Sequence, residues 1–561
     1  MIRARVLVSG DPLSLARGAD VVKLALETEL AYYGLEQEIA VEYMGQTGRE
    51  DVLPLIAVYP EGTLYGPVRP EDMPYLVEEH LYKGRVVSHL LAPPDFLPGK
   101  IAHLPGREGA MYAQQRVVLR RAGSIDPQNI EEYIADDGYF ALGQAITEMT
   151  PAEVLQTVKD SGLQGRGGAG FPTGLKWSFV ATRPEKIKYI VCNADESEPG
   201  TFKDRLILEG DPHAILEGLA LAGYATGAQE GWIYIRGEYT QSKKRLEEAI
   251  RQAEELGLLG DHILESDFSF HIHVHAGAGA YICGEETALL ESLEGKRGIP
   301  RIRPPYPTVV GFRGMPTVVN NVETLANVAP IILHGAEWFR SRGTEKCPGT
   351  KVYTMLGDVN VTGLVEVPLG TTLREIIEVY SGGMKDGKTF KCAQTGGSSG
   401  SIIPASALDV PLDYTSMREQ GVALGSGALL VCAEDKCVVD LVYVLMRFFQ
   451  AESCGKCTPC RIGTTRMVEA LDRLRHGQGT EQDITDLEET AEYVRDGSFC
   501  GLGQAAPVPI LTGLRHFREE FESHVQGHCP AGVCPMQPRP VAEAVSHDYL
   551  GFSLPGAEAP G

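Results

Sequence analysis

Several features that would narrow the function of this chain are missing from its 561 residues. No window reaches the roughly eighteen apolar residues that a membrane span requires, and the apolar run within residues 1–10 is too short for a signal peptide. Basic residues are scarce, with 51 Lys and Arg against 75 Asp and Glu, which gives a formal net charge of −24. An acidic chain repels nucleic acid and anionic membranes, so neither is expected as a partner. The composition fits a protein without a membrane span that works together with other subunits.

Cysteine is absent before Cys192. The chain has twelve cysteines, few for its length, and three of them stand within seven residues. This distribution favours metal ligands and reduced thiols over a secreted disulfide framework. A reducing compartment is therefore expected, and the cytoplasm is the predicted location.

The three clustered cysteines have the spacing of an iron–sulfur loop. Cys454, Cys457 and Cys460 form a C-x2-C-x2-C motif, and Cys500 follows forty residues later. This pattern suits a [4Fe-4S] cube, which takes three ligands from one compact loop and the fourth from another element. Zinc is the main alternative, because C-x2-C also opens structural zinc sites, although those usually close with a second C-x2-C or a histidine pair. These four cysteines are the predicted metal ligands.

Length and periodicity predict an α/β multidomain chain. Short strands alternate with amphipathic helices at the front, and glycine-rich strand–helix alternation follows in the middle. Helical periodicity dominates the last third, so the cluster cysteines should lie at helix ends in a bundle. Six segments are expected: an α/β unit at 1–90, a proline-rich linker at 91–113, a Rossmann-like layer at 114–340, a β-rich module at 345–410, a helical cluster domain at 436–530 and a tail at 531–561.

The middle third contains a glycine-rich loop, GRGGAGFPTGLKW at 165–177. It includes a formal G-x-G-x-x-G, but residues 152–163 before it have helical periodicity, where a Rossmann fingerprint needs a strand. Glycines let backbone amides approach a phosphate or a flavin edge, and Lys176 adds a positive charge. A loop whose glycines serve tight turns alone is the alternative.

Three further segments place polar groups at the ends of apolar strands. A buried strand at 189–192 opens into NADESEPG, whose acids suit ribose hydroxyls, ring N–H groups or a metal. PTVVNNVET at 316–324 puts an Asn at a helix N-cap, where donors can hold an anion. The strand at 270–275 runs through a glycine turn into the helix start YICGEET. This strand carries three histidines, His271, His273 and His275, on one face. No cysteine or carboxylate of ligand spacing joins them, so a half-exposed polar face is favoured over a metal site.

Taken together, these four segments and the cluster cysteines resemble, in order, the 51 kDa-type flavoprotein subunit of NADH dehydrogenase over about residues 116–521. The resemblance implies FMN and NAD(H) in one cleft of an atypical Rossmann-like fold, a β-grasp module and a helical [4Fe-4S] domain. By position, FMN would be held by Gly165, Gly167, Lys176, Asn193, Asp195, Tyr281, Gly284, Glu285, Asn320, Asn321 and Thr324. The nucleotide would lie on Phe171, Phe179 and Glu198, with Glu286 and Lys176 nearby.

Two positions depart from the family pattern. Arg303 and Tyr306 stand where the family commonly has Lys and Phe, which leaves the preference for NAD over NADP slightly open. A flavin exchanges a hydride with NADH and single electrons with a cube, so the resemblance requires no nucleophile or general base. No catalytic acid–base residue is predicted.

The two ends of the chain carry weaker resemblances. Residues 45–50, 54–62 and 70–72 are similar to the thioredoxin-like [2Fe-2S] protein of the 24 kDa type, whose cluster loop has cysteines that this chain lacks. The front unit is therefore expected to hold no cluster and to dock another subunit. Near the other end, HCPAGVCP resembles the lead-in to the ferredoxin extension of hydrogenase-type relatives. Cys529 and Cys534 cannot ligate a second cube alone, so an incidental pair is the favoured interpretation.

The fused, cluster-free front and the short tail most resemble the β subunit of molybdenum- or tungsten-dependent, NAD-linked formate dehydrogenases. That resemblance implies a hetero-oligomer in which a partner chain carries the Mo or W site and further iron–sulfur clusters. The alternative is the diaphorase subunit of an NAD-reducing hydrogenase with a Ni-Fe partner, and the fusion disfavours a subunit of NADH:quinone oxidoreductase. A non-catalytic relay or scaffold with a relic cleft is an alternative of another class, against which the intact cofactor motifs argue.

Overall fold

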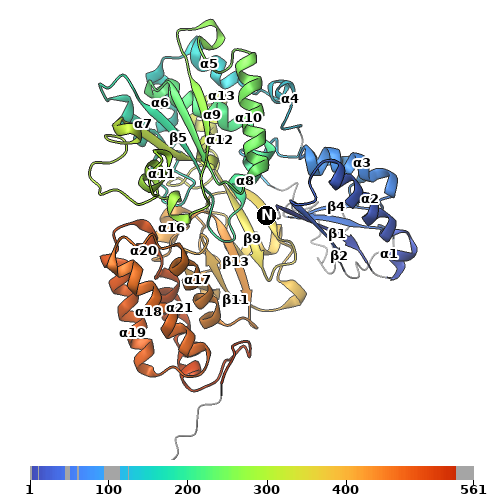
Figure 1. Ribbon diagram of the computed structural model, residues 1–561, viewed down its shortest axis with the longest axis vertical. Coiled ribbons are helices and arrows are strands. Elements are labelled where there is room, and N and C mark those ends of the chain that lie inside the picture. The colour runs from blue at the N-terminus through green and yellow to red at the C-terminus, as the bar shows by residue number, and fades with distance from the viewer. Residues whose placement is uncertain are drawn as a thin grey trace, which may run out of the picture.

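The computed structural model describes residues 3–10, 12–44, 51–59, 62–93, 114–123 and 125–537. Figure 1 shows a small blue unit at one side, a green α/β layer, a yellow and orange β module and an orange-red helical bundle. Among the helices of these ranges, none combines the length and apolarity that crossing a bilayer demands. The motif at 45–50, most of the proline-rich linker and residues 538–561 of the tail lie outside the described residues.

The N-terminal unit has the expected thioredoxin-like topology. Its sheet has the order β2-β1-β3-β4, with β1 parallel to β2 and antiparallel to β3. Along α2, Val22, Leu26 and Leu30 recur every four residues and are buried, which places one face of the helix on the sheet. The elements are β1 (Ala4–Ser9), α1 (Pro12–Ala16), α2 (Ala19–Tyr32), β2 (Ile39–Met44), β3 (Ile56–Tyr59), β4 (Thr63–Tyr65) and α3 (Met73–Leu76).

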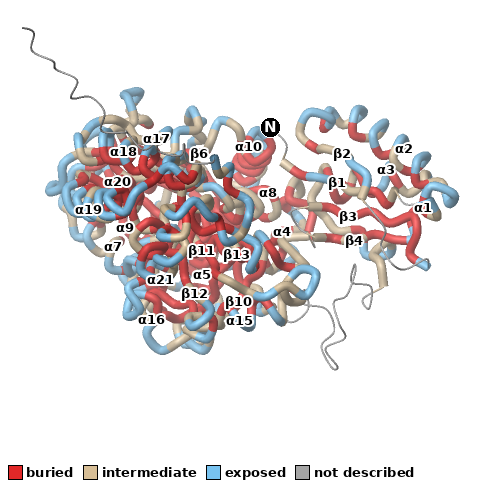
Figure 2. Tube along the Cα trace, turned by 90° about the horizontal axis from the view of Figure 1, so that it is seen from below, coloured by how far each residue is buried: buried red, intermediate tan, exposed pale blue. Residues whose placement is uncertain are grey.

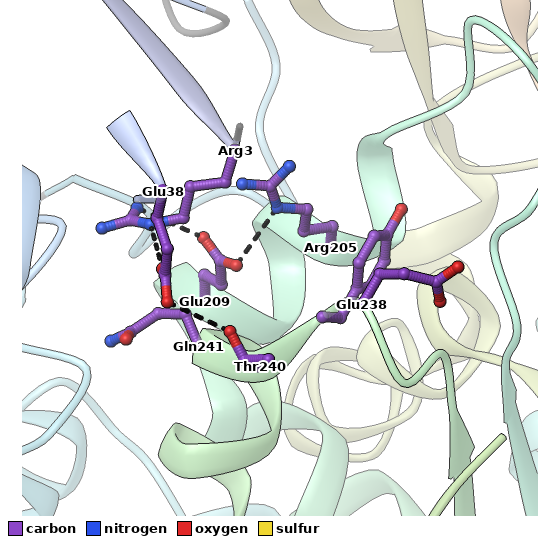
Figure 3. Close-up of a pocket in the computed structure, with 8 residues that line it drawn as sticks. Arg3, Glu38, Arg205, Glu209, Glu238, Thr240 and Gln241 are labelled. Atoms are coloured by element: carbon purple, nitrogen blue, oxygen red, sulfur yellow. Dashed lines mark hydrogen bonds and ion pairs between the residues drawn. The ribbon is translucent and has the colours of Figure 1, made fainter. Parts of the chain in front are cut away.

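A network of charges joins this unit to the α/β layer (Figure 3). Arg3 pairs through Nε with Glu38 Oε2 at 3.2 Å and through Nη1 with Glu209 Oε2 at 3.7 Å. Arg205 Nε donates to Glu209 Oε1 at 3.2 Å, and Thr240 Oγ1 donates to Glu38 Oε1 at 3.1 Å. Burial raises the pKa of Glu209, but the neighbouring guanidinium groups outweigh it and hold the pKa below its usual value. The N-terminal unit is therefore bonded to the layer by partly buried ion pairs.

The α/β layer is built on a parallel sheet with the order β7-β6-β5-β8. Its strands are β5 (Tyr189–Ala194), β6 (Glu230–Ile235), β7 (His271–Ala276) and β8 (Thr317–Asn321). From β5, the next two strands in the chain are added on one side of the sheet, first β6 and then β7. Strand β8 is added on the other side of β5. Ligands of open parallel sheets bind at the carboxyl ends of the strands where the order reverses. The topology thus directs attention to the ends of β5 and β8.

The helix α9 (Pro212–Thr226) is buried along almost its whole length. It starts where the Asp211 side chain accepts from Ala214 N at 3.2 Å, and it ends at Gly227, which has a left-handed conformation. A Cβ at Gly218 would lie 2.4 Å from the carbonyl oxygen of Leu325, so glycine is needed where α9 meets α12. The other helices are α4 (Ile130–Ala135), α5 (Phe140–Glu148), α6 (Pro151–Asp160), α7 (Thr173–Ala181), α8 (Lys203–Gly210), α10 (Thr240–Glu255), α11 (Glu286–Leu293), α12 (Val322–Ala326), α13 (Val328–His334) and α14 (Ala336–Arg340).

The β module is a mixed sheet with the order β10-β9-β13-β11-β12. A hairpin is followed by a short helix and by a strand that runs parallel to β9, which is the β-grasp arrangement. Strand β13 lies beyond the expected range of 345–410 and yet occupies the centre of the sheet. The elements are β9 (Thr350–Gly357), β10 (Gly363–Pro368), α15 (Leu373–Glu375), β11 (Phe390–Thr395), β12 (Ile402–Pro404), α16 (Tyr414–Glu419) and β13 (Ala428–Ala433).

The C-terminal part is a helical bundle, as the periodicity predicts. In Figure 2 the red, buried segments run through its interior while pale-blue turns face outward. Thr480 forms a capping box with Asp483 at the start of α19, which satisfies free amides of the first turn. The helices are α17 (Val438–Glu452), α18 (Thr458–Arg475), α19 (Glu481–Gly497), α20 (Gly501–Ala505) and α21 (Val508–Val525).

Candidate functional site

The predicted site residues meet at the carboxyl edge of the parallel sheet, at the reversal between β5 and β8. Asn193 near the end of β5 and Asn321 at the end of β8 are partners in register. Asn193 Nδ2 donates to the carbonyl oxygen of Gly284 at 2.9 Å, which brings the turn before α11 to the same edge. Asn320 accepts a hydrogen bond from Trp177 Nε1 at 2.8 Å and thereby fixes α7 beside β8.

The glycine loop lies directly on this edge. A helix, α6, precedes it, which confirms that the motif is not a Rossmann fingerprint. Gly165 N donates to the carbonyl oxygen of Phe171 at 2.8 Å and closes the loop, and Arg166 N donates to Thr324 Oγ1 at 2.8 Å. A Cβ at Gly167 would lie 3.0 Å from the Cβ of Asn321, so the close approach of loop and strand favours glycine.

The three acids after β5 have different environments. Glu196 is buried and accepts from Asp204 N at 2.9 Å and Arg205 N at 3.0 Å, so it caps the start of α8. Asp195 is also buried; its Oδ1 accepts from Ser197 Oγ at 2.9 Å, and its Oδ2 has no hydrogen-bond partner among the described residues. Burial raises the pKa of Asp195 to about 7. A buried acceptor without a partner suits a ligand donor.

Glu198 connects four separate segments. Its Oε1 accepts from Ser399 N at 2.8 Å, Ser399 Oγ at 2.5 Å and Tyr281 OH at 3.3 Å. Its Oε2 accepts from Ser426 Oγ at 3.2 Å. Burial raises the pKa of Glu198, although these hydrogen bonds oppose the shift. This side chain therefore ties the β module to the segment that follows β5.

Acidic and basic side chains alternate around the start of α11. Glu285 caps that helix by accepting from the backbone amides of Thr287 and Ala288, each at 3.0 Å. Glu286 pairs with Lys176 Nζ at 3.3 Å and with Arg303 Nη1 at 3.2 Å. Arg303 also lies 3.7 Å from Glu285 Oε1. The two basic groups near the cleft are thus already matched by carboxylates.

The aromatic residues assigned to the nucleotide are exposed. Phe171 is 43 % and Phe179 44 % exposed, with ring centroids 6.5 Å apart, and Tyr306 is 54 % exposed. Exposed aromatic rings offer flat apolar faces on which a nucleotide base can stack. Their exposure fits a stacking surface for a nucleotide.

The three histidines of β7 have separate partners. His273 stacks on Trp232 with centroids 4.6 Å apart, and His275 stacks on Tyr234 at 5.5 Å. His271 Nε2 lies 3.2 Å from Asp261 Oδ1. These contacts agree with the polar-face interpretation.

Behind the cleft lies a buried ionic network that the sequence did not reveal. Lys203 Nζ lies 2.9 Å from Glu323 and 2.7 Å from Asp204, whose other oxygen accepts from Asn321 Nδ2 at 2.6 Å. Lys351 Nζ lies 3.5 Å from Glu323, and burial lowers the pKa of this lysine to about 8. Lys203 and Glu323 are far apart in the sequence and share no motif, so no local pattern joins them.

The four cluster cysteines converge at the top of the bundle. Cys454 and Cys457 lie in the turn between α17 and α18, Cys460 is in the first turn of α18, and Cys500 caps α20. Burial raises the pKa of Cys460 to about 11, and the neighbouring thiols of Cys457, Cys500 and Cys454 act in the same direction. A Cβ at Gly503 would lie 3.1 Å from the Cβ of Cys460, so α20 and the first turn of α18 are in contact.

The cleft and the cysteine turn are in direct contact. Tyr281 N donates to Glu452 Oε2 at 3.0 Å, and Glu452 ends the helix that leads into Cys454. Arg297 Nη2 donates to the carbonyl oxygen of Cys454 at 3.2 Å, and Lys456 Nζ donates to that of Pro300 at 2.6 Å. The segment around α11 therefore borders both the sheet edge and the cysteine turn.

Comparison with known proteins identifies both regions. Residues 158–330 match the Nuo51 FMN-binding domain, and residues 440–524 match the NADH-ubiquinone oxidoreductase-F iron–sulfur binding region. The chain is 50 % identical over 422 residues to the NADP-reducing hydrogenase subunit HndC of Solidesulfovibrio fructosivorans, covering 75 % of this chain and 86 % of that one. It is 44 % identical over 402 residues to an NADH-quinone oxidoreductase subunit of Escherichia coli, covering 71 % and 90 %.

A solved structure extends the match to nearly the whole chain. The NAD+-reducing [NiFe]-hydrogenase in the H2-reduced state superposes with a TM-score of 0.65 at 30 % identity, covering 94 % of this chain and 85 % of that one. Fold, cleft and matched regions define an NAD(H)-linked FMN and iron–sulfur oxidoreductase subunit, which confirms the expected FMN and [4Fe-4S] cofactors. The chain belongs to the family of 51 kDa-type (Nuo51) flavoprotein subunits of NADH-ubiquinone oxidoreductase.

The open acceptor of Asp195 leads to a pH-dependent prediction. A carboxyl whose pKa is raised by folding from 3.8 to about 7 destabilises the folded state once pH exceeds the unfolded value, and the penalty is complete above pH 7. In the FMN-free chain, Asp195→Asn should therefore change stability little at pH 4 and raise it by up to about 4 kcal/mol at pH 8. Thermal melts between pH 4 and 8 would measure this, with exposed Asp267→Asn as the control. Equal stabilities of variant and wild type at every pH would contradict the assignment.

Proposed function

We propose that this chain is the diaphorase subunit of an NAD-reducing hydrogenase-type complex, in which it passes electrons between NAD(H) and a [4Fe-4S] cluster through FMN. The observation that carries the proposal is the contact between cleft and cysteine turn, made by Tyr281 and Glu452 at 3.0 Å. Electron transfer between two cofactors needs their binding segments to be adjacent and rigid. One segment, 281–303, supplies contacts to both.

The hydrogenase setting has more support than the formate dehydrogenase setting. The solved NAD+-reducing hydrogenase aligns with 94 % of this chain, and HndC is named as a subunit of an NADP-reducing hydrogenase. In sequence, HndC and the quinone oxidoreductase relative from Escherichia coli match similar shares of the chain, 75 % and 71 %, so the structural match to nearly the whole chain is what favours the hydrogenase. A partner with a Ni-Fe site and further iron–sulfur clusters is therefore the favoured one, and a Mo or W partner is the alternative.

The cleft residues fit a bound flavin. The glycine loop presents backbone groups over Asn321, and the open Oδ2 of Asp195 offers an acceptor to a ring or ribose donor. Lys176 and Thr324 complete the ring of polar groups that the family resemblance assigns to FMN. A bound flavin would supply the exchange of a hydride for single electrons.

The charged residues at the start of α11 favour NAD(H) over NADP(H). A 2′-phosphate requires a free cation, commonly an arginine, whereas an acidic residue suits the 2′-hydroxyl. Arg303 and Lys176 are both paired with Glu286. Phe171, Phe179 and Tyr306 provide the exposed rings on which the bases can stack.

The test separates this chain from its partners. The purified chain should oxidise NADH with ferricyanide or a viologen as acceptor, and it should prefer NADH to NADPH. It should show no activity with hydrogen or formate, because among its described residues no ligand set for a Ni-Fe or Mo site lies near the flavin residues. The native complex should contain nickel on metal analysis. Molybdenum or tungsten in its place would move the assignment to formate dehydrogenase, and a chain without NADH:ferricyanide activity would contradict the diaphorase role.

A further inference from the structure

A second group of thiols lies at the other end of the bundle from the cluster cysteines. Among the described residues, four buried side chains bring their ligand atoms within 4.8 Å of one another: Cys437, His524, Cys529 and Cys534. Cys437 is the N-cap of α17, His524 is in the last turn of α21, and the other two follow α21. Cys529 and Cys534 therefore do not form an isolated pair, as the sequence alone indicated, but lie together with Cys437 and His524.

The spacing of these atoms is that of ligands around one ion. Cys437 Sγ and His524 Nε2 are 3.4 Å apart, His524 Nε2 and Cys534 Sγ 3.3 Å, and the two sulfur atoms 3.5 Å. Tetrahedral zinc with Zn–S near 2.3 Å and Zn–N near 2.0 Å would place its ligand atoms about 3.5–3.8 Å apart. A disulfide between Cys437 and Cys534 would need about 2.05 Å. The contacts thus match a coordination sphere and not a covalent bridge.

The surrounding backbone orients the ligands. His524 Nδ1 lies 2.6 Å from the carbonyl oxygen of Glu520, so the Nδ1 proton donates there and Nε2 is left as the lone-pair nitrogen that faces the thiols. Asp440 N lies 3.4 Å from Cys437 Sγ and donates to it, as amides at a helix N-terminus do to thiolates. Both contacts are of the kind that support metal ligands.

We propose a structural Zn²⁺ site in which three thiolates and one imidazole, all buried, fill the four positions of the ion: Cys437, His524, Cys529 and Cys534. Sulfur and imidazole donors select zinc over Mg²⁺ or Ca²⁺, and a closed four-ligand sphere is typical of structural sites. Three of the four ligands lie outside the matched iron–sulfur region of 440–524, so that region does not account for the site. It is also independent of the proposed function.

The proposed site would connect two separate parts of the bundle. It ties residues 529–534, after the last helix, to the start of α17, and the other end of α17 leads into Cys454. The ion would therefore fix both the exit of the chain from the bundle and the helix that presents the cysteine turn. Its loss should loosen the bundle without removing a ligand of the [4Fe-4S] cluster.

The experiment is metal analysis and X-ray absorption on the full-length chain. We expect about one zinc per chain beside about four irons, and a zinc edge that fits three sulfur neighbours and one nitrogen. Cys529→Ser and Cys534→Ser should lower zinc at least tenfold while iron and FMN remain. Cys347→Ser, a buried thiol outside the group, is the matched control and should keep its zinc.

Several results, in the wild-type chain or in the variants, would overturn the zinc proposal. Wild-type chain free of zinc, zinc with oxygen-rich coordination, or zinc retained in both serine variants would overturn the proposal. A fifth iron in place of zinc would overturn the identity of the ion. Because the absorption measurement uses wild-type protein, a variant that fails to fold does not prevent the decision.

Discussion

Replacing Cys500 by serine is expected to reduce iron from about four atoms per chain to nearly none while FMN stays bound. Cys500 comes from a separate element, the cap of α20, and it completes the group formed by Cys454 and Cys457 of the α17–α18 turn and Cys460 of α18. A cube with only three thiolates is exposed to water and degrades. The measurements are iron content and the electron paramagnetic resonance signal of the reduced chain.

The flavin reaction should survive that change. NADH:ferricyanide turnover depends on the cleft at the sheet edge, whereas electron delivery to the partner depends on the cluster. Cys432→Ser, a buried thiol in β13, is the matched control and should keep its iron. Retention of about four irons in Cys500→Ser would contradict the ligand assignment. Two irons beyond one cube in the wild-type chain would contradict a cluster-free N-terminal unit.

The second large effect is expected at Glu198. Replacing it by alanine leaves Ser399 N without its acceptor and releases Tyr281 OH and Ser426 Oγ. If Glu198 positions the nucleotide, alanine removes ground-state binding of NADH, so KM for NADH should rise at least fivefold with kcat little changed. FMN occupancy, measured by absorbance, should stay close to that of the wild type.

Glutamine at the same position serves as the control. Glu198→Gln keeps an acceptor for Ser399 N and removes only the charge, so its effect on KM should be smaller than that of alanine. Phe171→Ala should also raise KM without loss of flavin, because the ring is exposed and makes no contact that closes the glycine loop. Loss of FMN with an unchanged KM in the remaining holoprotein would reverse the roles assigned to flavin and nucleotide residues.

Short-range patterns in the sequence predicted a large part of this structure. The helix before the glycine loop, the strand before Asn193 and the N-cap at Asn321 each follow from periodicity and capping within a few residues. The C-x2-C-x2-C spacing placed three thiols in one turn because so short a segment cannot spread them far apart. The cysteine-free front unit likewise has the thioredoxin-like strand order that its motifs indicated.

Other assignments depended on contacts that local patterns do not contain. The acids Asp195, Glu196 and Glu198 are neighbours in sequence, yet one caps α8, one bridges to the β module and one keeps an open oxygen. Strand β13 joined the centre of the sheet although it lies past the expected boundary. The thiol pair Cys529 and Cys534 lies beside two buried side chains, Cys437 and His524, that no spacing rule connects with it.

The sequence by itself determined the elements, the glycine loop and the three-cysteine turn, because helix periodicity, strand burial and ligand spacing are properties of residues a few positions apart. Only the tertiary structure decided that β8 returns beside β5, and that the segment around α11 touches both the sheet edge and the cysteine turn. It alone joined Cys437 to His524, which stand 87 residues apart. Packing of distant helices fixes such pairs, and burial then sets the charge and pKa of the groups that meet there.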